Sequence, residues 1–188
     1  MVMMKALFSS ILGFFFICKG SVDLVKPQSA YSKEVLHNLC ERVSQSGENA
    51  LVPQKWLVPV ITEMSWGKVI VRDYDVKNNA DFVRVNTYKD CIITPSGAYD
   101  WDWSKTGLSH KGGISIEDVA PLLDKADVFI LSRGVDFVLQ VQAKTVEYLW
   151  KNGKEVFVLQ SYEAAIKYNE LVARSAGKKI ALLLHSTC

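Results

Sequence analysis

The end of the chain, residues 145–188, alternates helical and apolar segments with almost no residues between them. Each helical segment ends at a glycine, and each is followed by a short β-branched or apolar run. Helices that alternate with buried strands indicate an α/β sheet, in which right-handed crossovers place the helices on the sheet faces. The predicted elements are helices at 145–151 and 161–175, ended by Gly153 and Gly177, and strands at 155–160 and 180–184.

Shorter signals upstream indicate further strands. The turn signal Pro95-Ser96-Gly97 ends one strand and begins another at residues 98–103. Two tryptophans alternate with two aspartates in that second strand, so each pair is expected to share one sheet face. A continuous apolar run nearer the middle of the chain is typical of a strand buried on both faces. The strands predicted here are 68–72, 90–94, 98–103 and 128–132.

One more helix is expected at residues 118–125, with Asp118 as its N-cap and Pro121 in the first turn, where a missing N–H matters little. Residues 73–86 are interpreted as an inserted surface hairpin with Asn78-Asn79 at its turn, because asparagine tolerates the left-handed region. Together these elements predict a three-layer α/β domain with a central mixed sheet and a β-α-β-α-β C-terminal half.

Several short motifs occur together and in order between residues 64 and 188. They are Ser65-Trp66-Gly67, Thr87-Tyr88-Lys89-Asp90-Cys91, Trp101-Asp102-Trp103, Thr106-Gly107, His110, Arg133-Gly134, Val156-Phe157-Val158-Leu159-Gln160 and His185-Ser186-Thr187-Cys188. In these motifs the chain resembles the adipogenesis-associated branch of the Mth-type domain family. It departs from the family pattern at Ser132, where glycine is usual, and at Gln142, where proline is expected.

The resemblance implies a cytosolic regulatory or scaffold protein without enzymatic activity, which promotes fat-cell differentiation through an unidentified protein partner. A mitochondrial branch of the same family acts in the assembly of respiratory complex I, so an assembly factor is one alternative. A second alternative is a small-anion-binding or enzymatic domain that uses a pocket around Arg133 and His110. The resemblance also implies that residues 185–188 dock into the domain.

The chain of 188 residues is predicted to have three parts. Residues 1–20 contain the apolar run 6–18, which is shorter than the ~20 residues that span a bilayer, so no stable membrane span is expected. This segment is either an alternative first exon or gene-model extension, or a signal peptide cleaved after Gly20 that would make the protein secretory. Residues 21–63 are interpreted as a poorly ordered extension, and residues 64–188 as the Mth-type domain.

The composition argues against several classes of protein. The net charge is only +2 and no block of basic residues occurs, whereas nucleic acid binding requires a basic face or stripe. The four cysteines form no Cys-x-x-Cys pair, which favours free thiols in a reducing compartment and hence a cytoplasmic location. Neither a Gly-x-Gly-x-x-Gly cradle nor a Walker lysine is present, so no nucleotide or other cofactor is predicted.

The first candidate binding residues are Arg133 and Gly134, which directly follow the predicted strand 128–132. Ligands of open α/β sheets bind outside the carboxyl ends of the strands, and an arginine there could pair bidentately with a carboxylate or phosphate. The alternative is that Arg133 forms an internal ion pair with Asp102 or Asp136.

Aromatic and acidic residues near the second turn are further candidates. Trp101 and Trp103 are interpreted either as the apolar wall of a pocket or as core residues. Asp102, together with Asp100, is interpreted either as an acid pair or as a solvated carboxylate on a strand face. Trp150 on the helix 145–151 would mark an interaction surface if it is exposed, because aromatic anchors dominate many interfaces.

Histidine and cysteine side chains could be assembled into a metal site or a Cys–His nucleophile pair. The residues available are His110, His185, Cys188 and Cys91, of which only His185 and Cys188 are close in sequence. Zinc sites usually use short-range pairs such as Cys-x-x-Cys, and no orienting residue for a nucleophile is readable. The sequence therefore predicts no metal ligand and no catalytic residue.

Overall fold

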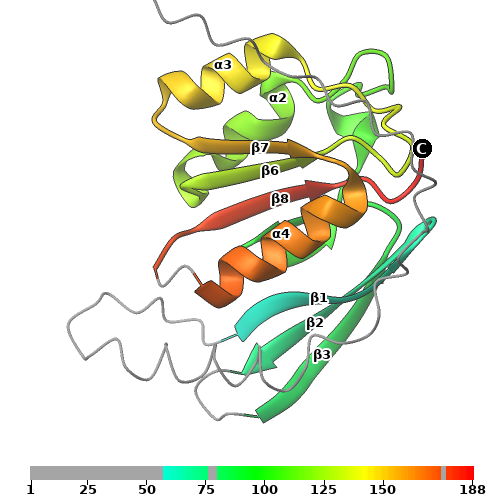
Figure 1. Cartoon of the computed structure of the whole chain (residues 1–188), viewed down its shortest axis with the longest axis vertical. Helices are drawn as coiled ribbons and strands as arrows, with labels where there is room; N and C mark the ends of the chain where they lie inside the picture. Colours follow the sequence, from blue (N-terminus) through cyan, green and yellow to red (C-terminus); the bar gives the residue numbers. More distant parts are fainter. Residues whose placement is uncertain (1–56, 76–79, 175–176) are drawn as a thin grey trace, which may run out of the picture.

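The computed structural model describes residues 57–75, 80–174 and 177–188 (Figure 1). The expectation for residues 1–20 lies outside these ranges, as does that for the extension 21–63 except at residues 57–63, which form part of a strand and are not poorly ordered. None of the helices within the described ranges is long and apolar enough to cross a membrane. The elements are β1 (Leu57–Ser65), β2 (Lys68–Asp75), β3 (Ala80–Tyr88), β4 (Cys91–Thr94), β5 (Gly97–Asp100), the 3-10 helix η1 (Trp103–Lys105), α2 (Ile116–Val119), the 3-10 helix η2 (Ala120–Lys125), β6 (Val128–Ser132), α3 (Ala143–Lys151), β7 (Glu155–Leu159), α4 (Ser161–Arg174) and β8 (Ile180–Leu184).

The strands form two sheets. The first is an antiparallel sheet in the order β1-β2-β3, and the second has five strands in the order β5-β4-β8-β6-β7. In the larger sheet β6 runs parallel to both β7 and β8, whereas β4 runs antiparallel to β5 and β8. The C-terminal half is therefore a β6-α3-β7-α4-β8 unit, and the predicted mixed α/β sheet is confirmed.

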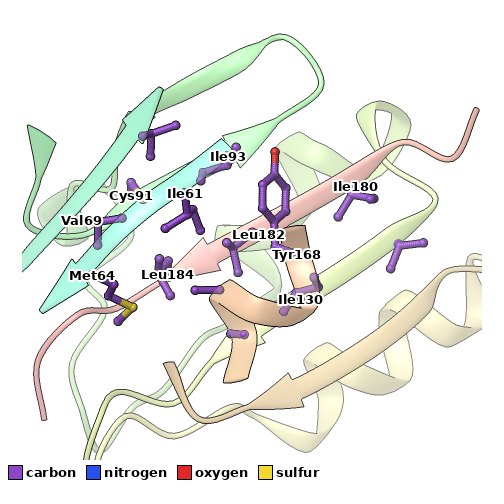
Figure 2. Packing of buried hydrophobic residues seen from close by; sticks show 14 residues of the cluster. Ile61, Met64, Val69, Cys91, Ile93, Ile130, Tyr168, Ile180, Leu182 and Leu184 are labelled. Atoms are coloured by element: carbon purple, nitrogen blue, oxygen red, sulfur yellow. The ribbon is translucent and has the colours of Figure 1, made fainter. Parts of the chain in front are cut away.

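The two faces of the five-stranded sheet bury two separate hydrophobic clusters. One cluster joins Ile130 and Leu182 of the sheet to Tyr168 of α4 and Ile61 of β1 (Figure 2). The other cluster joins the adjacent residues on the opposite face to the elements α2, η2 and α3, with Leu149 of α3 fully buried. Because successive strand side chains point to opposite faces, one continuous apolar strand serves both clusters. The result is three layers, as predicted.

Helix α4 holds the smaller sheet against the larger one through two polar side chains. The buried Tyr168 hydroxyl donates to the carbonyl of Pro59 at 3.0 Å. The Asn169 amide accepts from the Ile61 N–H at 3.1 Å and donates to the Ile61 carbonyl at 2.7 Å. These bonds tie Pro59 and Ile61 of β1 to the domain, although both lie N-terminal to the boundary predicted at Met64.

The predicted strand 98–103 ends early, at Asp100. The Asp102 carboxylate accepts a hydrogen bond from the N–H of Ser104, and this local bond begins a 3-10 turn instead of continuing the strand. Trp101 is buried and Trp103 is half-buried, and both pack on the same hydrophobic cluster, so the two tryptophans share one side as expected although the strand does not continue to them.

The predicted helix 118–125 begins earlier and changes type. The cap is Ser115, and Asp118 lies inside the first turn, where its carboxylate accepts from the Ser115 N–H at 2.8 Å. The chain tightens into η2 at Ala120, next to Pro121, which has no N–H to continue an α-helical ladder.

The segment 73–86, expected as a surface insertion, supplies strand residues on both sides of a hairpin. In the pairing of β2 with β3, Val69 lies opposite Tyr88 at one end and Asp75 lies opposite Ala80 at the other. The predicted turn Asn78-Asn79 lies outside the described residues. The buried Asp73 carboxylate is bound by Arg84 at 2.8 Å. The paired arms of this hairpin are therefore part of the smaller sheet.

Candidate functional site

The end of the chain lies against the loop that follows β6. β6 and β8 are parallel neighbours, so the residues that follow them emerge at the same edge of the sheet. The N–H of Val135 donates to the Thr187 carbonyl at 2.5 Å. Gly134 has a φ of +84°, and a Cβ at this position would overlap the carbonyl group of Cys188. A glycine is therefore required for the chain end to pack here.

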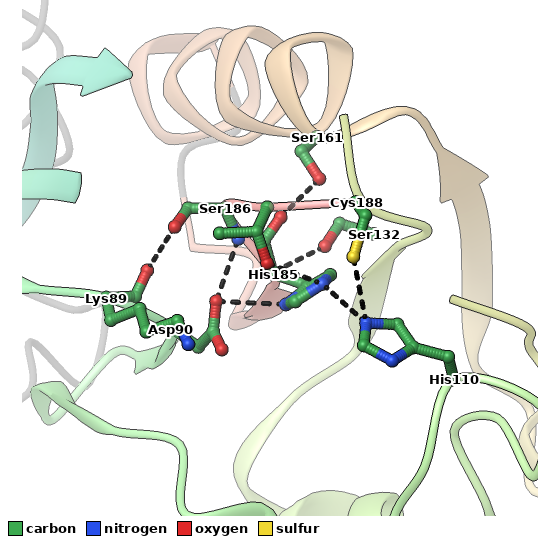
Figure 3. A network of polar contacts seen from close by, with 9 residues as sticks. Lys89, Asp90, His110, Ser132, Ser161, His185, Ser186 and Cys188 are labelled. Carbon is green, nitrogen blue, oxygen red and sulfur yellow. Dashed lines mark hydrogen bonds and ion pairs between the residues drawn. The ribbon is translucent and has the colours of Figure 1, made fainter. Parts of the chain in front are cut away.

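Further hydrogen bonds hold the terminal segment 185–188 in place (Figure 3). The His185 N–H donates to Ser132 Oγ at 2.7 Å, and the hydroxyl of Ser161 donates to the His185 carbonyl at 2.5 Å. The Ser186 N–H donates to Asp90 Oδ1 at 2.8 Å, and the Ser186 hydroxyl donates to the Lys89 carbonyl at 2.5 Å. The segment is thus docked into the domain, as expected.

His110, His185 and Cys188 converge at this place, and we refer to them as the His110–His185–Cys188 cluster. The two Nε2 atoms lie 3.3 Å apart, and Cys188 Sγ lies 3.2 Å from His110 Nε2. The Thr187 hydroxyl lies 3.1 Å from His185 Nε2. All three potential ligand atoms of the cluster lie within 4.8 Å of one another.

Asp90 orients the buried histidine of the cluster. Its Oδ1 lies 3.0 Å from His185 Nδ1, and the His185 side chain is only 2% exposed. A carboxylate can only accept, so this contact places a proton on His185 Nδ1, and in the neutral form of the ring the lone pair is on Nε2. The lone pair of His185 Nε2 then faces His110 and Cys188.

Trp103 forms one wall of the cluster. The centre of its indole ring lies 4.6 Å from that of His185 and 5.1 Å from that of His110. Its indole N–H is buried and finds no hydrogen-bond acceptor among the described residues. The cluster therefore combines three convergent atoms that could bind a metal with a neighbouring indole N–H that has no hydrogen-bond acceptor in the described part of the chain.

The residues predicted from the sequence are distributed around this site. His110 and Trp103 belong to it, and Gly134 packs on Cys188. The buried Trp101 contacts Trp103, with ring centres 5.7 Å apart. Asp102 is exposed, and hydrogen bonds from the Ser104 hydroxyl and N–H lower the pKa of its carboxyl below the usual value. Asp102 is therefore a local cap and not part of the cluster.

Arg133 does not form the internal ion pair weighed in the sequence analysis. Its guanidinium donates to the Phe137 carbonyl at 3.1 Å and to the Leu139 carbonyl at 3.4 Å. It also lies 3.4 Å from Gln140 Oε1, and among the described residues no carboxylate lies within ion-pair distance. Arg133 thus holds its own loop, including Phe137, which has an uncommon positive φ of 60°.

Two cysteines that the sequence analysis considered together are separated. Cys91 is fully buried in the hydrophobic cluster beneath α4, and this burial, with the nearby Asp90 carboxylate, raises the pKa of its thiol far above the usual value. Cys188 is partly exposed and contacts His110. Asp90 and Ser132 occur among the motifs and departures named above, but no site role was predicted for them, because only the order of the strands in the sheet gives that signal.

Comparison with known proteins identifies the family. A model of the family described as "Protein of unknown function (DUF498/DUF598)" matches residues 61–185. A conserved hypothetical protein from Pyrococcus horikoshii is similar at 24% identity over 68% of this chain and 98% of that chain, with a TM-score of 0.49. An outer membrane protein from Bartonella henselae is similar at 21% identity over 69% of this chain and 96% of that chain, with a TM-score of 0.48. The family match covers well over half of the chain, which therefore belongs to the DUF498/DUF598 family.

Proposed function

We propose that this chain is a regulatory or scaffold protein that acts by binding another protein and has no enzymatic activity. The observation that carries the proposal is Trp150, which is 63% exposed on α3. On the other side of the same helix, Thr145 and Leu149 are buried against the sheet, so Trp150 is not needed for the core. Large exposed aromatic side chains are enriched among the residues that dominate protein interfaces.

The charges around Trp150 support an apolar contact in preference to an electrostatic one. Glu147 and Lys151 are neighbours of Trp150 on α3 and pair with each other at 2.7 Å. Their charges balance, so the indole is the principal anchor that this face offers. The partner expected from this chemistry is a protein with an apolar pocket that accepts the indole of Trp150.

The place where α/β sheets usually bind ligands is occupied by the chain itself, which further supports a binding protein. Gly134 is covered by the carbonyl of Cys188, and the Arg133 guanidinium donates to carbonyls of its own loop. A small anion at Arg133 would have to compete with these acceptors. The alternative of an anion-binding or enzymatic pocket around Arg133 and His110 is therefore less favoured.

The motifs shared with the adipogenesis-associated branch support a cytosolic role in promoting fat-cell differentiation. We would test this by expressing the full chain and its variants in pre-adipocytes that lack the endogenous protein. Lipid accumulation and the proteins captured by cross-linking would be measured together. Trp150→Ala should abolish both capture of a defined partner and the effect on differentiation.

The matched control is Tyr99→Ala. Tyr99 is another exposed aromatic residue, 41% exposed on β5, which forms the edge of the sheet opposite to β7. This variant should keep both readouts. Unchanged capture and differentiation with Trp150→Ala would contradict the proposal, and loss of the effect with Arg133→Ala but not with Trp150→Ala would favour the anion-binding alternative.

A further inference from the structure

Two of the three distances between ligand atoms of the His110–His185–Cys188 cluster have the dimensions of a metal site, and all three lie within 4.8 Å. The distances from His110 Nε2 to His185 Nε2 and to Cys188 Sγ are 3.3 and 3.2 Å. Around tetrahedral zinc, with bonds of about 2.1 Å to nitrogen and 2.3 Å to sulfur, ligand atoms lie roughly 3.3–3.6 Å apart. We propose that these three side chains bind one Zn²⁺ ion, a site that is independent of the proposed protein-binding role.

Asp90 provides the outer support that metal-binding histidines usually have. Such a histidine donates its second ring N–H to a carboxylate or carbonyl, which fixes the tautomer and increases the basicity of the ligating nitrogen. The 3.0 Å contact between Asp90 and His185 Nδ1 is of this kind. Asp90 also accepts from the N–H of Ser186, so the chain holds the carboxylate independently of any metal.

Binding of a cation would replace the hydrogen bonds within the cluster. The Nδ1 proton of His185 is engaged by Asp90, so a lone pair of His185 Nε2 faces His110 Nε2 across 3.3 Å. Without a cation, the Thr187 hydroxyl can donate to His185 Nε2 and the Cys188 thiol can donate to His110 Nε2. When Zn²⁺ binds, the thiol proton leaves to solvent, a Zn–S bond forms, and both imidazoles donate lone pairs to the metal.

Two imidazoles and one thiolate are ligands that zinc prefers, and they leave a fourth position. The nearest described hydroxyl is that of Thr187, 3.1 Å from His185 Nε2. A water molecule in the fourth position would bring a hydrogen-bond acceptor into the neighbourhood of Trp103, whose buried indole N–H has none among the described residues. The metal would join the loop that carries His110 to the end of the chain.

The test uses the purified full chain and measures zinc uptake by competition with a chromophoric chelator, with Co²⁺ as a spectroscopic probe. Wild type should take up zinc at the cluster and give thiolate-to-cobalt charge-transfer absorption. His110→Ala and Cys188→Ser change partly exposed residues, should stay folded by circular dichroism, and should bind zinc at least about 100-fold more weakly. Asp90→Asn should weaken binding by about 10- to 100-fold.

The matched control is the double variant His37→Ala, Cys40→Ser, which removes the other histidine and a second cysteine of the sequence. It should retain the affinity and the charge-transfer absorption of wild type. The proposal is overturned if wild type takes up no zinc, or if Cys188→Ser binds as tightly as wild type. Alkylation of Cys188 at the same rate with and without zinc would also overturn it and would favour a Cys–His nucleophile.

Discussion

Replacing Gly134 by alanine tests whether the end of the chain packs as the structure shows. Gly134 has a φ of +84°, and an added Cβ would overlap the Cys188 carbonyl group and lie 2.9 Å from the Thr187 carbonyl oxygen. Neither obstacle is the tip of a flexible side chain, so the terminal segment has to move away. The hydrogen bond from Val135 N–H to the Thr187 carbonyl would then be lost.

Gly153 is the matched control, because it separates backbone strain from the steric contact. Its φ is +71°, but a Cβ there would meet none of the described atoms within 4 Å. Alanine at either position should cost roughly 1–2 kcal/mol for the left-handed backbone alone. Gly134→Ala should cost about 1–3 kcal/mol more than Gly153→Ala, because at least one hydrogen bond of ~1 kcal/mol and the packing of the segment are lost.

The free energy of unfolding of both variants would be measured by urea denaturation, and the exposure of the chain end by the rate of Cys188 alkylation. Gly134→Ala should increase the alkylation rate, whereas Gly153→Ala should leave it unchanged, since Gly153 follows α3 and is remote from the cluster in sequence. Equal losses of stability for the two variants, with equal alkylation rates, would refute the packing of Cys188 on Gly134.

Two further predictions concern the support of the site and the boundary of the domain. Ser132→Ala removes the acceptor of the buried His185 N–H and should lower the free energy of unfolding by about 1–3 kcal/mol, whereas Ser104→Ala, at an exposed serine, should change it by less than about 0.5 kcal/mol. A fragment of residues 57–188 should unfold cooperatively with nearly the melting temperature of the full chain. A fragment of residues 64–188 lacks the backbone groups that bind Tyr168 and Asn169, and should melt at least about 5 °C lower; equal melting of the two fragments would support the boundary at Met64.

The C-terminal half could be predicted well because its local signals agree with its packing. The strands at 128–132 and 180–184 are continuous apolar runs, and every residue of β6 and β8 is buried. The helices between them end near glycines with positive φ, Gly153 and Gly177. The strand predicted at 98–103 was wrong only at residues 101–103, where a single side chain to backbone bond at Asp102 overrides an alternation that is typical of a strand.

The contact between Asp90 and His185 could not be predicted from sequence spacing, because the two residues meet through strand pairing. β4 pairs antiparallel with β8 so that Cys91 lies opposite Leu184. The residue before Cys91 is Asp90 and the residue after Leu184 is His185, and this register therefore brings them together. Apolar patterns predict that both strands are buried, but they do not specify which strands are neighbours.

The two proposed sites lie at opposite ends of the sheet. Trp150 lies near the end of α3, just before β7 starts at Glu155, which pairs with Val128 at the beginning of β6. The cluster follows the other ends of the strands, after Ser132 and Leu184. A five-residue strand is roughly 16 Å long, so the two sites share no side-chain contact. Changes at sites this far apart usually act independently, and loss of zinc binding and loss of the protein partner can therefore be attributed to separate causes.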